Sequence, residues 1–516
     1  MSLLLTALIG LLQYRVVHAI GHLDIETTSG SIRGFVNETT PNVAQFLGIP
    51  YAEPPVGSRR WLPPARKSKE NGVLNATQFG PACSQWESDI NVEPTVYTVD
   101  APNFSISRLD YQSEDCLSLN VWTPWHSENT TQSANVSLPV LLWVYGGGFT
   151  SGSGNVPYQI PSPWIEKSGK HIVVSINHRM NVLGFPNAAG LKLEEQNLGM
   201  LDLRLAVEWT RDNIANFGGD PDRIVLWGQS SGAIAIDHYN FAHPEDTIVA
   251  GFIMHSGTST LEFTANDPEH TNFTFVAEKL GCPFVDPTKQ LDCMRGVDAN
   301  DIVLFMKYYY QNATQTGLAF GPVVDNVTLF PNYTARALAG NFSRKPALIG
   351  NTANEGSSFV LPYNQSYGPG QDAADATTVG LFMCPTIQTS HDRYAANAAT
   401  FRYLYAGNFT TLSPQWWEGA YHSSDIPMVF GTYGLTRGPG TELQRQVSEK
   451  MQEYWLAFVE DPVNGLQKLG WDSYENGSGE GVMFGYEGEV EQKIGEGKLD
   501  QPCDGLVPNG LPPPPR

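Results

Sequence analysis

The chain has 516 residues, of which 41% are hydrophobic and 11% aromatic, enough to build a large buried core. Its formal net charge of −22 argues against nucleic acid or an anionic membrane surface as a partner. There is no internal repeat and no linker long enough to separate domains. We therefore expect a signal peptide at 1–19, one domain over 20–510 and a proline-rich tail at 511–516.

The first residues resemble an export signal. Residues 3–12 form an apolar run that is too short to span a bilayer, and Val17, His18 and Ala19 follow at a spacing that suits cleavage after Ala19. A buried N-terminal helix is the alternative. No apolar tail closes the chain, so neither a stable membrane anchor nor a lipid-anchor signal is expected. These features predict a secreted protein.

Two further features favour the secretory pathway. The six cysteines fit disulfides in an oxidising compartment, and no spacing among them resembles a metal site. Thirteen N-x-[ST] sequons suggest heavy glycosylation. They lie at Asn37, Asn75, Asn103, Asn129, Asn135, Asn272, Asn312, Asn326, Asn332, Asn341, Asn364, Asn408 and Asn476.

Short apolar runs alternate with helical segments along the chain. Strands are predicted within 29–35, 44–61, 117–124, 138–149, 171–179, 224–227, 251–257 and 345–356. Helices are predicted over 196–216 and 444–461, whereas 260–345 reads only as unassigned helices and loops. This alternation implies an α/β fold with a large, mostly parallel sheet, helices on both faces and long loop insertions.

Residues 223–236, RIVLWGQSSGAIAI, contain the pattern G-x-S-x-G between an apolar strand and small, helix-compatible residues. In that context the serine sits on a strained turn, and glycines on either side let strand and helix pass closely. Ser230 would then expose its hydroxyl at a helix N-terminus, where a developing anion is favoured. We interpret Ser230 as a nucleophile.

A nucleophilic serine needs donors for the oxyanion. Three glycines, Gly146, Gly147 and Gly148, directly follow a buried strand and leave backbone N–H groups unobstructed by side chains. A flexible turn is the plainer interpretation. With a serine elbow downstream, we expect an oxyanion hole formed by the N–H groups of Gly147, Gly148 and Ser231.

The serine also needs a base, and the base needs a carboxylate that orients it. Enzymes with this elbow carry them in the order Ser, acid, His. Glu355 follows an apolar strand in a glycine-flanked loop and is the preferred acid, with Asp325, Asp372 and Asp375 as competitors. For the base, His422 lies in a loop before an apolar run, whereas His391 resembles a residue of a surface helix.

Nearly all of the mature chain resembles the type-B carboxylesterase/lipase family, the cholinesterase-like branch of the α/β-hydrolases, and its fungal secreted members in particular. The segments that carry the resemblance are FLGIPYAEPPVGSRRW, EDCLSLNVWTP, VLLWVYGGGFTSGS, INHRMNVLGF, NLGMLDLRLAVEW, NIANFGGDPDRIVLWGQSSGA, FGPVVDN, IGNTANEGSSF and GAYHSSDIPMVFG. The resemblance implies the α/β-hydrolase fold, a serine esterase without metal or organic cofactor, and Ser230, Glu355 and His422 as its triad.

The resemblance also implies pairings that stabilise the fold. It implies the disulfides Cys83–Cys116 and Cys282–Cys293, which leaves Cys384 and Cys503 to pair with each other. Arg60 with Glu114, and Arg179 with Asp202, match buried ion pairs of the family. We expect these four charged residues to be structural.

Departures from the family pattern bear on the substrate. Gln229 precedes the serine where cholinesterases carry Glu, which removes a charge that would favour cationic esters. Ser231 replaces the common Ala, and Asn181 stands where the family usually has Gly, a position that Asn tolerates. The segment between Cys83 and Cys116 is polar, unlike the flap of a lipase.

The sequence therefore predicts hydrolysis of a neutral small-molecule ester, with the oligomeric state open. Three alternatives remain at this point. They are an interfacial lipase, an esterase or acyltransferase devoted to one secondary metabolite, and a non-catalytic adhesion protein on the same fold.

Overall fold

The computed structural model describes residues 23–86, 111–125, 137–261, 263–312, 317–360, 367–435 and 437–504. The expected signal peptide and the proline-rich tail lie outside these ranges. Among the described residues, eleven strands form one sheet in the order β16-β15-β14-β13-β12-β11-β9-β10-β8-β4-β3. Their bounds are β3 (Phe35–Asn37), β4 (Thr40–Pro50), β8 (Ser118–Pro124), β9 (Leu138–Val144), β10 (Ile172–Ile176), β11 (Gly219–Gln229), β12 (Val249–His255), β13 (Ala347–Thr352), β14 (Thr400–Tyr405), β15 (Glu480–Phe484) and β16 (Glu491–Gly495).

The middle of the sheet is parallel. Every neighbouring pair from β10 across β9, β11, β12, β13 and β14 to β15 runs parallel, and the pairs toward both edges are antiparallel. The predicted α/β-hydrolase architecture is confirmed. Two small sheets lie beside it, one of β1 (Asp24–Thr27), β2 (Gly30–Arg33) and β5 (Val73–Asn75), the other of β6 (Ala82–Cys83) and β7 (Gln112–Ser113).

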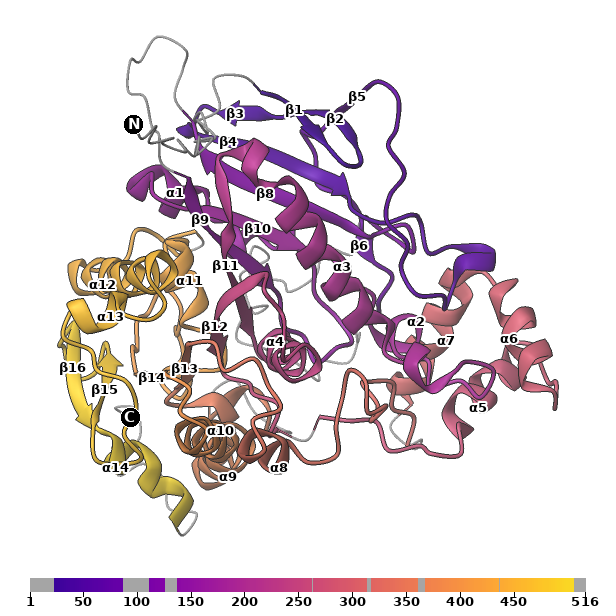
Figure 1. Ribbon diagram of the computed structural model, residues 1–516. Coiled ribbons are helices and arrows are strands. Elements are labelled where there is room, and N and C mark those ends of the chain that lie inside the picture. The colour runs from indigo at the N-terminus through magenta and orange to yellow at the C-terminus, as the bar shows by residue number, and fades with distance from the viewer. Residues whose placement is uncertain are drawn as a thin grey trace, which may run out of the picture.

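Helices cover both faces of the sheet. Figure 1 shows α3 and α4 on one face and α1, α11 and α12 on the other, and strands β9 to β12 lie between them. The α-helices are α1 (Ser162–Ser168), α2 (Asn181–Gly184), α3 (Leu198–Asn213), α4 (Ser231–Ala242), α5 (Thr271–Lys279), α6 (Pro287–Arg295), α7 (Ala299–Gln311), α8 (Tyr333–Leu338), α9 (Gln371–Thr377), α10 (Cys384–Ala395), α11 (Ile426–Phe430), α12 (Glu442–Glu460), α13 (Gly465–Lys468) and α14 (Glu496–Asp500).

The central strands are apolar along their whole length because both of their faces are covered. Val140 to Val144 of β9 and Ile224 to Trp227 of β11 have no exposed surface, and the two strands lie in parallel register. The predicted helix over 196–216 is α3, which continues as a 3₁₀ turn, Ile214–Phe217. No helix among the described residues has the length and apolar character that a membrane span requires.

The sequence prediction was wrong in two places. Residues 51–61 are not a strand, because β4 ends at Pro50 and a 3₁₀ turn, Gly57–Arg59, follows. The strands β14, β15 and β16 were missed. Within β14 the polar Arg402 interrupts the apolar run, yet it is buried, and its Nη1 donates to Ser390 Oγ at 3.1 Å and lies 3.4 Å from Asp500 Oδ1.

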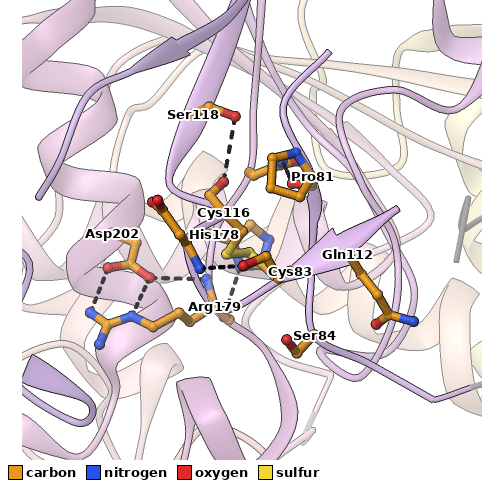
Figure 2. The surroundings of a disulfide bond; sticks show 12 residues. Pro81, Cys83, Ser84, Gln112, Cys116, Ser118, His178, Arg179 and Asp202 are labelled. Carbon is orange, nitrogen blue, oxygen red and sulfur yellow. Dashed lines mark hydrogen bonds and ion pairs between the residues drawn. A yellow bond between two sulfur atoms is a disulfide. The ribbon is translucent and has the colours of Figure 1, made fainter. Parts of the chain in front are cut away.

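The expected covalent and ionic pairs are present. Disulfides join Cys83 to Cys116, Cys282 to Cys293 and Cys384 to Cys503. Figure 2 shows the first of them beside the ion pair of Arg179 and Asp202, in which the guanidinium donates to both carboxylate oxygens at 2.9 and 2.7 Å. Arg60 makes the same forked contact with Glu114 at 2.6 Å for both bonds.

Asn181 adopts a left-handed backbone with a φ of 50°, and its side-chain amide donates to Ser84 O at 3.0 Å. The left-handed conformation that Asn was expected to tolerate here is therefore present, and a hydrogen bond holds its side chain.

Most described sequons lie where an oligosaccharide could be attached. The asparagine is exposed at 37, 75, 312, 326, 332, 341, 408 and 476. Asn272 is half-buried, and its amide donates to Ala319 O at 3.0 Å. The sequons at Asn103, Asn129, Asn135 and Asn364 lie outside the described residues.

Candidate active site

Ser230 occupies the turn between β11 and α4 with a φ of 54° and a ψ of −126°, a conformation that is strained for any residue with a side chain. The strain is tolerated because the surroundings permit no other path. A Cβ on Gly228 would lie 2.6 Å from the Gly232 carbonyl, and one on Gly232 would lie 2.2 Å from Val144 O. The Ser230 N–H donates to His255 O at 2.8 Å. The turn is thus fixed by backbone packing on every side.

The glycine loop after β9 lies directly against this turn. A Cβ on Gly146 would come within 2.9 Å of the Ser230 Cβ, and Gly147 and Gly148 have φ angles of 123° and 63°. The Gly147 carbonyl turns into its own loop and accepts from Thr150 N at 3.1 Å. Ser231 is the first residue of α4, so its N–H has no partner within the helix. The sequence-predicted donor set therefore meets beside Ser230.

Glu355 and His422 form a buried pair. His422 Nδ1 lies 2.5 Å from Glu355 Oε2, and the other carboxylate oxygen accepts from the N–H of Thr352 at 2.8 Å. Glu355 has no exposed surface. Because the carboxylate faces Nδ1, it favours the tautomer that carries the proton there and leaves Nε2 as the base.

The competing candidates make other contacts. Asp325 holds its own turn together, since its carboxylate accepts from three backbone N–H groups that follow it in the chain. Asp372 and Asp375 lie on α9. His391 lies on α10, and its Nε2 is 3.5 Å from Asp500 Oδ2, a contact remote from the Ser230 turn. The helix α9 packs against the turn of Glu355, yet neither these acids nor this histidine is among the residues that line the cavity described below.

Asn354, which the sequence reasoning missed, ties the loop of Glu355 to the loop of His422. Its side-chain amide donates to the carbonyls of Trp417 and Glu418 at 3.0 and 2.8 Å, and its backbone N–H donates to Ala420 O at 2.8 Å. The only local signal was an asparagine immediately before the candidate acid. Nothing in the sequence identifies partners more than sixty residues away.

Gln229 also contacts the candidate base. Its side-chain nitrogen lies 2.9 Å from His422 Nε2, so the amide donates to the nitrogen that must take up the serine proton. Gln229 was noted in the sequence because it is neutral where cholinesterases carry Glu. The sequence gave no indication of its contact with His422. Two rings, Phe359 and Phe382, cover the imidazole with centroid distances of 4.9 and 4.8 Å.

Ser230, the glycine loop, Gln229 and His422 line one cavity of about 390 Å³. Among the residues that the structure describes, His422 lines this cavity and no Asp, Glu, Lys or Arg does. Its lining residues are Tyr145, Gly146, Gly147, Gly148, Thr150, Ser151, Tyr158, Gln159, Gln229, Ser230, Ser231, Ile234, Leu261, Phe263, Ser358, Phe359, Leu381, Phe382, His422 and Ser423.

Comparisons with known proteins identify the family of the chain. The model of the Carboxylesterase family matches residues 22–374 and 368–501. The chain is 43% identical to a chlorogenic acid esterase of Aspergillus niger over 93% of both chains, and 40% identical to Secreted lipase 5 of Gibberella zeae over 95% of this chain and 94% of the relative. It is 30% identical to the para-nitrobenzyl esterase of Bacillus subtilis over 91% of this chain and 96% of that protein. The chain belongs to the carboxylesterase family and is a carboxylic ester hydrolase.

Proposed function

We propose that the protein is a secreted esterase that cleaves neutral esters through an acyl-enzyme on Ser230. In this proposal His422 is the general base, Glu355 orients it, and the N–H groups of Gly147, Gly148 and Ser231 stabilise the oxyanion. One observation carries the proposal. The strained serine turn, the glycine loop and His422, which is paired with Glu355, all line the same cavity.

The reaction proceeds in two halves. His422 Nε2 takes the Ser230 proton as the hydroxyl attacks the ester carbonyl, and the imidazolium then donates that proton to the departing alcohol. Water, activated by the same nitrogen, hydrolyses the acyl-enzyme and releases the acid. Glu355 stays ionised and stabilises the imidazolium. Each oxyanion donor contributes on the order of 10²–10³ in rate.

The cavity supports an ester of an aromatic acid as the substrate. Most of its exposed wall surface is apolar, and Phe263, Phe359 and Phe382 are among its rings, with the hydroxyl-bearing Thr150 and Ser358 also in the lining. Flat rings gain most from such walls. The relative named for chlorogenic acid, itself an ester of an aromatic acid, supports the aromatic acyl group. Chlorogenic acid also carries a free carboxyl, so this relative does not support the preference for charge that is proposed next. Because no Lys or Arg of the described segments lines the cavity, we propose that the enzyme prefers neutral esters to anionic ones.

A second candidate, a lipase, is favoured by the cavity mouth and by the relative named Secreted lipase 5. Phe263, Phe359 and Leu381 line the cavity and are 41%, 44% and 37% exposed, as a surface that meets long acyl chains would be. The flap segment on which the sequence argument against a lipase rested, between Cys83 and Cys116, lies mostly outside the described residues.

Secretion is supported by three disulfides and by the exposed sequons. Expression in a fungal host should give a glycosylated protein in the medium that begins near residue 20. Retention of residues 1–19 on the mature protein would contradict the proposal.

The activity is tested by labelling. A fluorophosphonate should modify Ser230 of the wild type, and Ser230→Ala should abolish both labelling and p-nitrophenyl acetate hydrolysis. A folded wild type that is not labelled would refute the acyl-enzyme mechanism. Rates for methyl cinnamate and for p-nitrophenyl esters of two to sixteen carbons, measured below and above substrate aggregation, separate the candidates. A jump in rate on aggregated long-chain esters would identify a lipase.

A further inference from the structure

A fully buried histidine outside the triad, His255 at the end of β12, lies beneath the candidate active site. Its Nε2 accepts from two indole N–H groups, those of Trp227 at 2.8 Å and Trp455 at 3.1 Å. An indole nitrogen can only donate, so Nε2 carries no proton. The imidazole proton must therefore be on Nδ1.

That proton is directed at the loop that carries the candidate base. His255 Nδ1 donates to Asp425 Oδ2 at 2.6 Å and also lies 2.7 Å from Tyr403 Oη, and the Tyr403 O–H donates to the same carboxylate oxygen at 3.0 Å. Asp425 is fully buried and stands three residues after His422. A buried carboxylate persists only with such donors, so the two bonds fix the position of this loop.

The same histidine also holds the nucleophile. Its backbone carbonyl accepts the Ser230 N–H at 2.8 Å, and Trp227 lies three residues before Ser230 on β11. One residue is thus bonded through its backbone to the serine turn and through its ring to the loop of His422. Ser230 and His422 are 192 positions apart in the sequence, and His255 is a direct link between the segments that carry them.

We propose that His255 and Asp425 are a positioning pair, which holds the Ser230 turn and the His422 loop at the separation that proton transfer requires. Neither residue lines the cavity, and each acts through another group. The proposal rests on the function proposed above, because it assigns a task to the pair only if Ser230 and His422 react together. A displacement of about 1 Å between two such groups lowers the reaction rate by about 100-fold.

Three variants separate positioning from simple stabilisation. His255→Leu removes the link, and Asp425→Ala removes the acceptor without leaving a buried charge unpaired. Asp425→Asn keeps an oxygen toward His255 and Tyr403 and is the conservative control. For each variant, complete fluorophosphonate labelling counts the competent sites, and kcat per labelled site, KM for p-nitrophenyl acetate and the thermal midpoint are measured.

We expect kcat per site to fall by about 100-fold in the leucine and alanine variants with KM unchanged, and to stay near wild type in Asp425→Asn. A structural role alone would lower the thermal midpoint or the number of sites and leave kcat per site intact. That result overturns the proposal, as does an Asp425→Asn variant as slow as Asp425→Ala. If His255→Leu does not fold, the two Asp425 variants decide. A wild type without labelling refutes the proposed function instead.

Discussion

The candidate site is built from two regions that are held in different ways. The first comprises the glycine loop after β9 and the Ser230 turn after β11, and its contacts are steric. Backbone meets backbone at Gly146, Gly228 and Gly232, where any Cβ would lie within 3 Å of a neighbouring atom. Such packing leaves no alternative position for the serine.

The second region comprises the loops after β13 and β14, which carry Glu355 and His422, and hydrogen bonds hold it. Asn354 donates to two carbonyls of the His422 loop, and Ser357 Oγ donates to Asn354 O at 2.8 Å. His422 itself lies under the Phe359 and Phe382 rings. From this difference we expect added side-chain volume to disrupt the first region. We expect the second region to be disrupted by the loss of hydrogen bonds and by changes of charge.

Gly232→Ala should have the largest effect. Its Cβ would lie 2.2 Å from Val144 O and 2.5 Å from Tyr145 O, so α4 and β9 must separate. We expect the free energy of unfolding to fall by about 3 kcal/mol, the upper end for an overpacked site. Activity should fall by about 100-fold, because the Ser231 N–H and Ser230 move together. Denaturant unfolding and esterase assays measure both quantities. Gly495→Ala, where a Cβ meets nothing within 4 Å, is the control.

This steric requirement explains why the sequence identifies the first region. Where only glycine fits, a short stretch of sequence shows the requirement. It appears as G-x-S-x-G after one apolar strand and as three glycines after another. The parallel strands on which both turns rest are continuous apolar runs, which are equally easy to recognise. Ser230, Gly147, Gly148 and Ser231 therefore followed from short segments.

Asn354→Ala should produce the next largest effect, in the second region. Removing the amide leaves the carbonyls of Trp417 and Glu418 buried without this donor, at a cost of about 2 kcal/mol. Because the lost bonds join the two loops, kcat should fall by about tenfold or more. Asn213→Ala is the matched control, since that buried amide joins Thr28 to the end of α3, far from the site. It should lose similar stability and keep its kcat. Equal kcat in both variants would contradict the comparison.

The second region could be predicted only in part. Glu355 and His422 required the chain order of the triad and the family resemblance, because a lone Glu or His in a loop has no local signature. The contacts of Asn354, Phe382 and Asp425 could not be predicted, since their partners are far away in the sequence. For the same reason β14 was missed. In the sequence, Arg402 resembles a surface residue. In the fold it is buried beside Asp500, which lies near the far end of the chain.

The two regions meet where the Gln229 amide contacts His422. A charge placed at this contact should show how far the first region controls the base of the second. Gln229→Glu puts a carboxylate beside His422 Nε2 and stabilises the imidazolium, which cannot act as a base. The acid limb of the kcat/KM profile should therefore move by about one unit to higher pH. Gln229→Met, which is neutral and of similar size, should leave the limb in place. An unmoved limb in both variants would show that the contact does not control the base.

The last prediction concerns Glu418, which is buried on the His422 loop. Burial raises the pKa of its carboxyl to about 8, and the Gln415 N–H and the charge of Arg437 oppose this only partly. The folded protein therefore holds a proton that the unfolded chain releases near its ordinary pKa of 4.5. Stability from this group is full below that pH and is lost as the pH rises toward 8.

Glu418→Gln keeps the acceptor for Gln415 and cannot ionise. Its thermal midpoint should match the wild type at pH 4 and exceed it increasingly up to pH 8. Glu480→Gln removes the same charge from an exposed position and should show no such trend. If the difference in thermal midpoint between Glu418→Gln and the wild type does not change with pH, the loop accommodates the ionised Glu418 carboxylate. Hydrogen bonds, and not charge, would then distinguish this region from the sterically fixed serine turn.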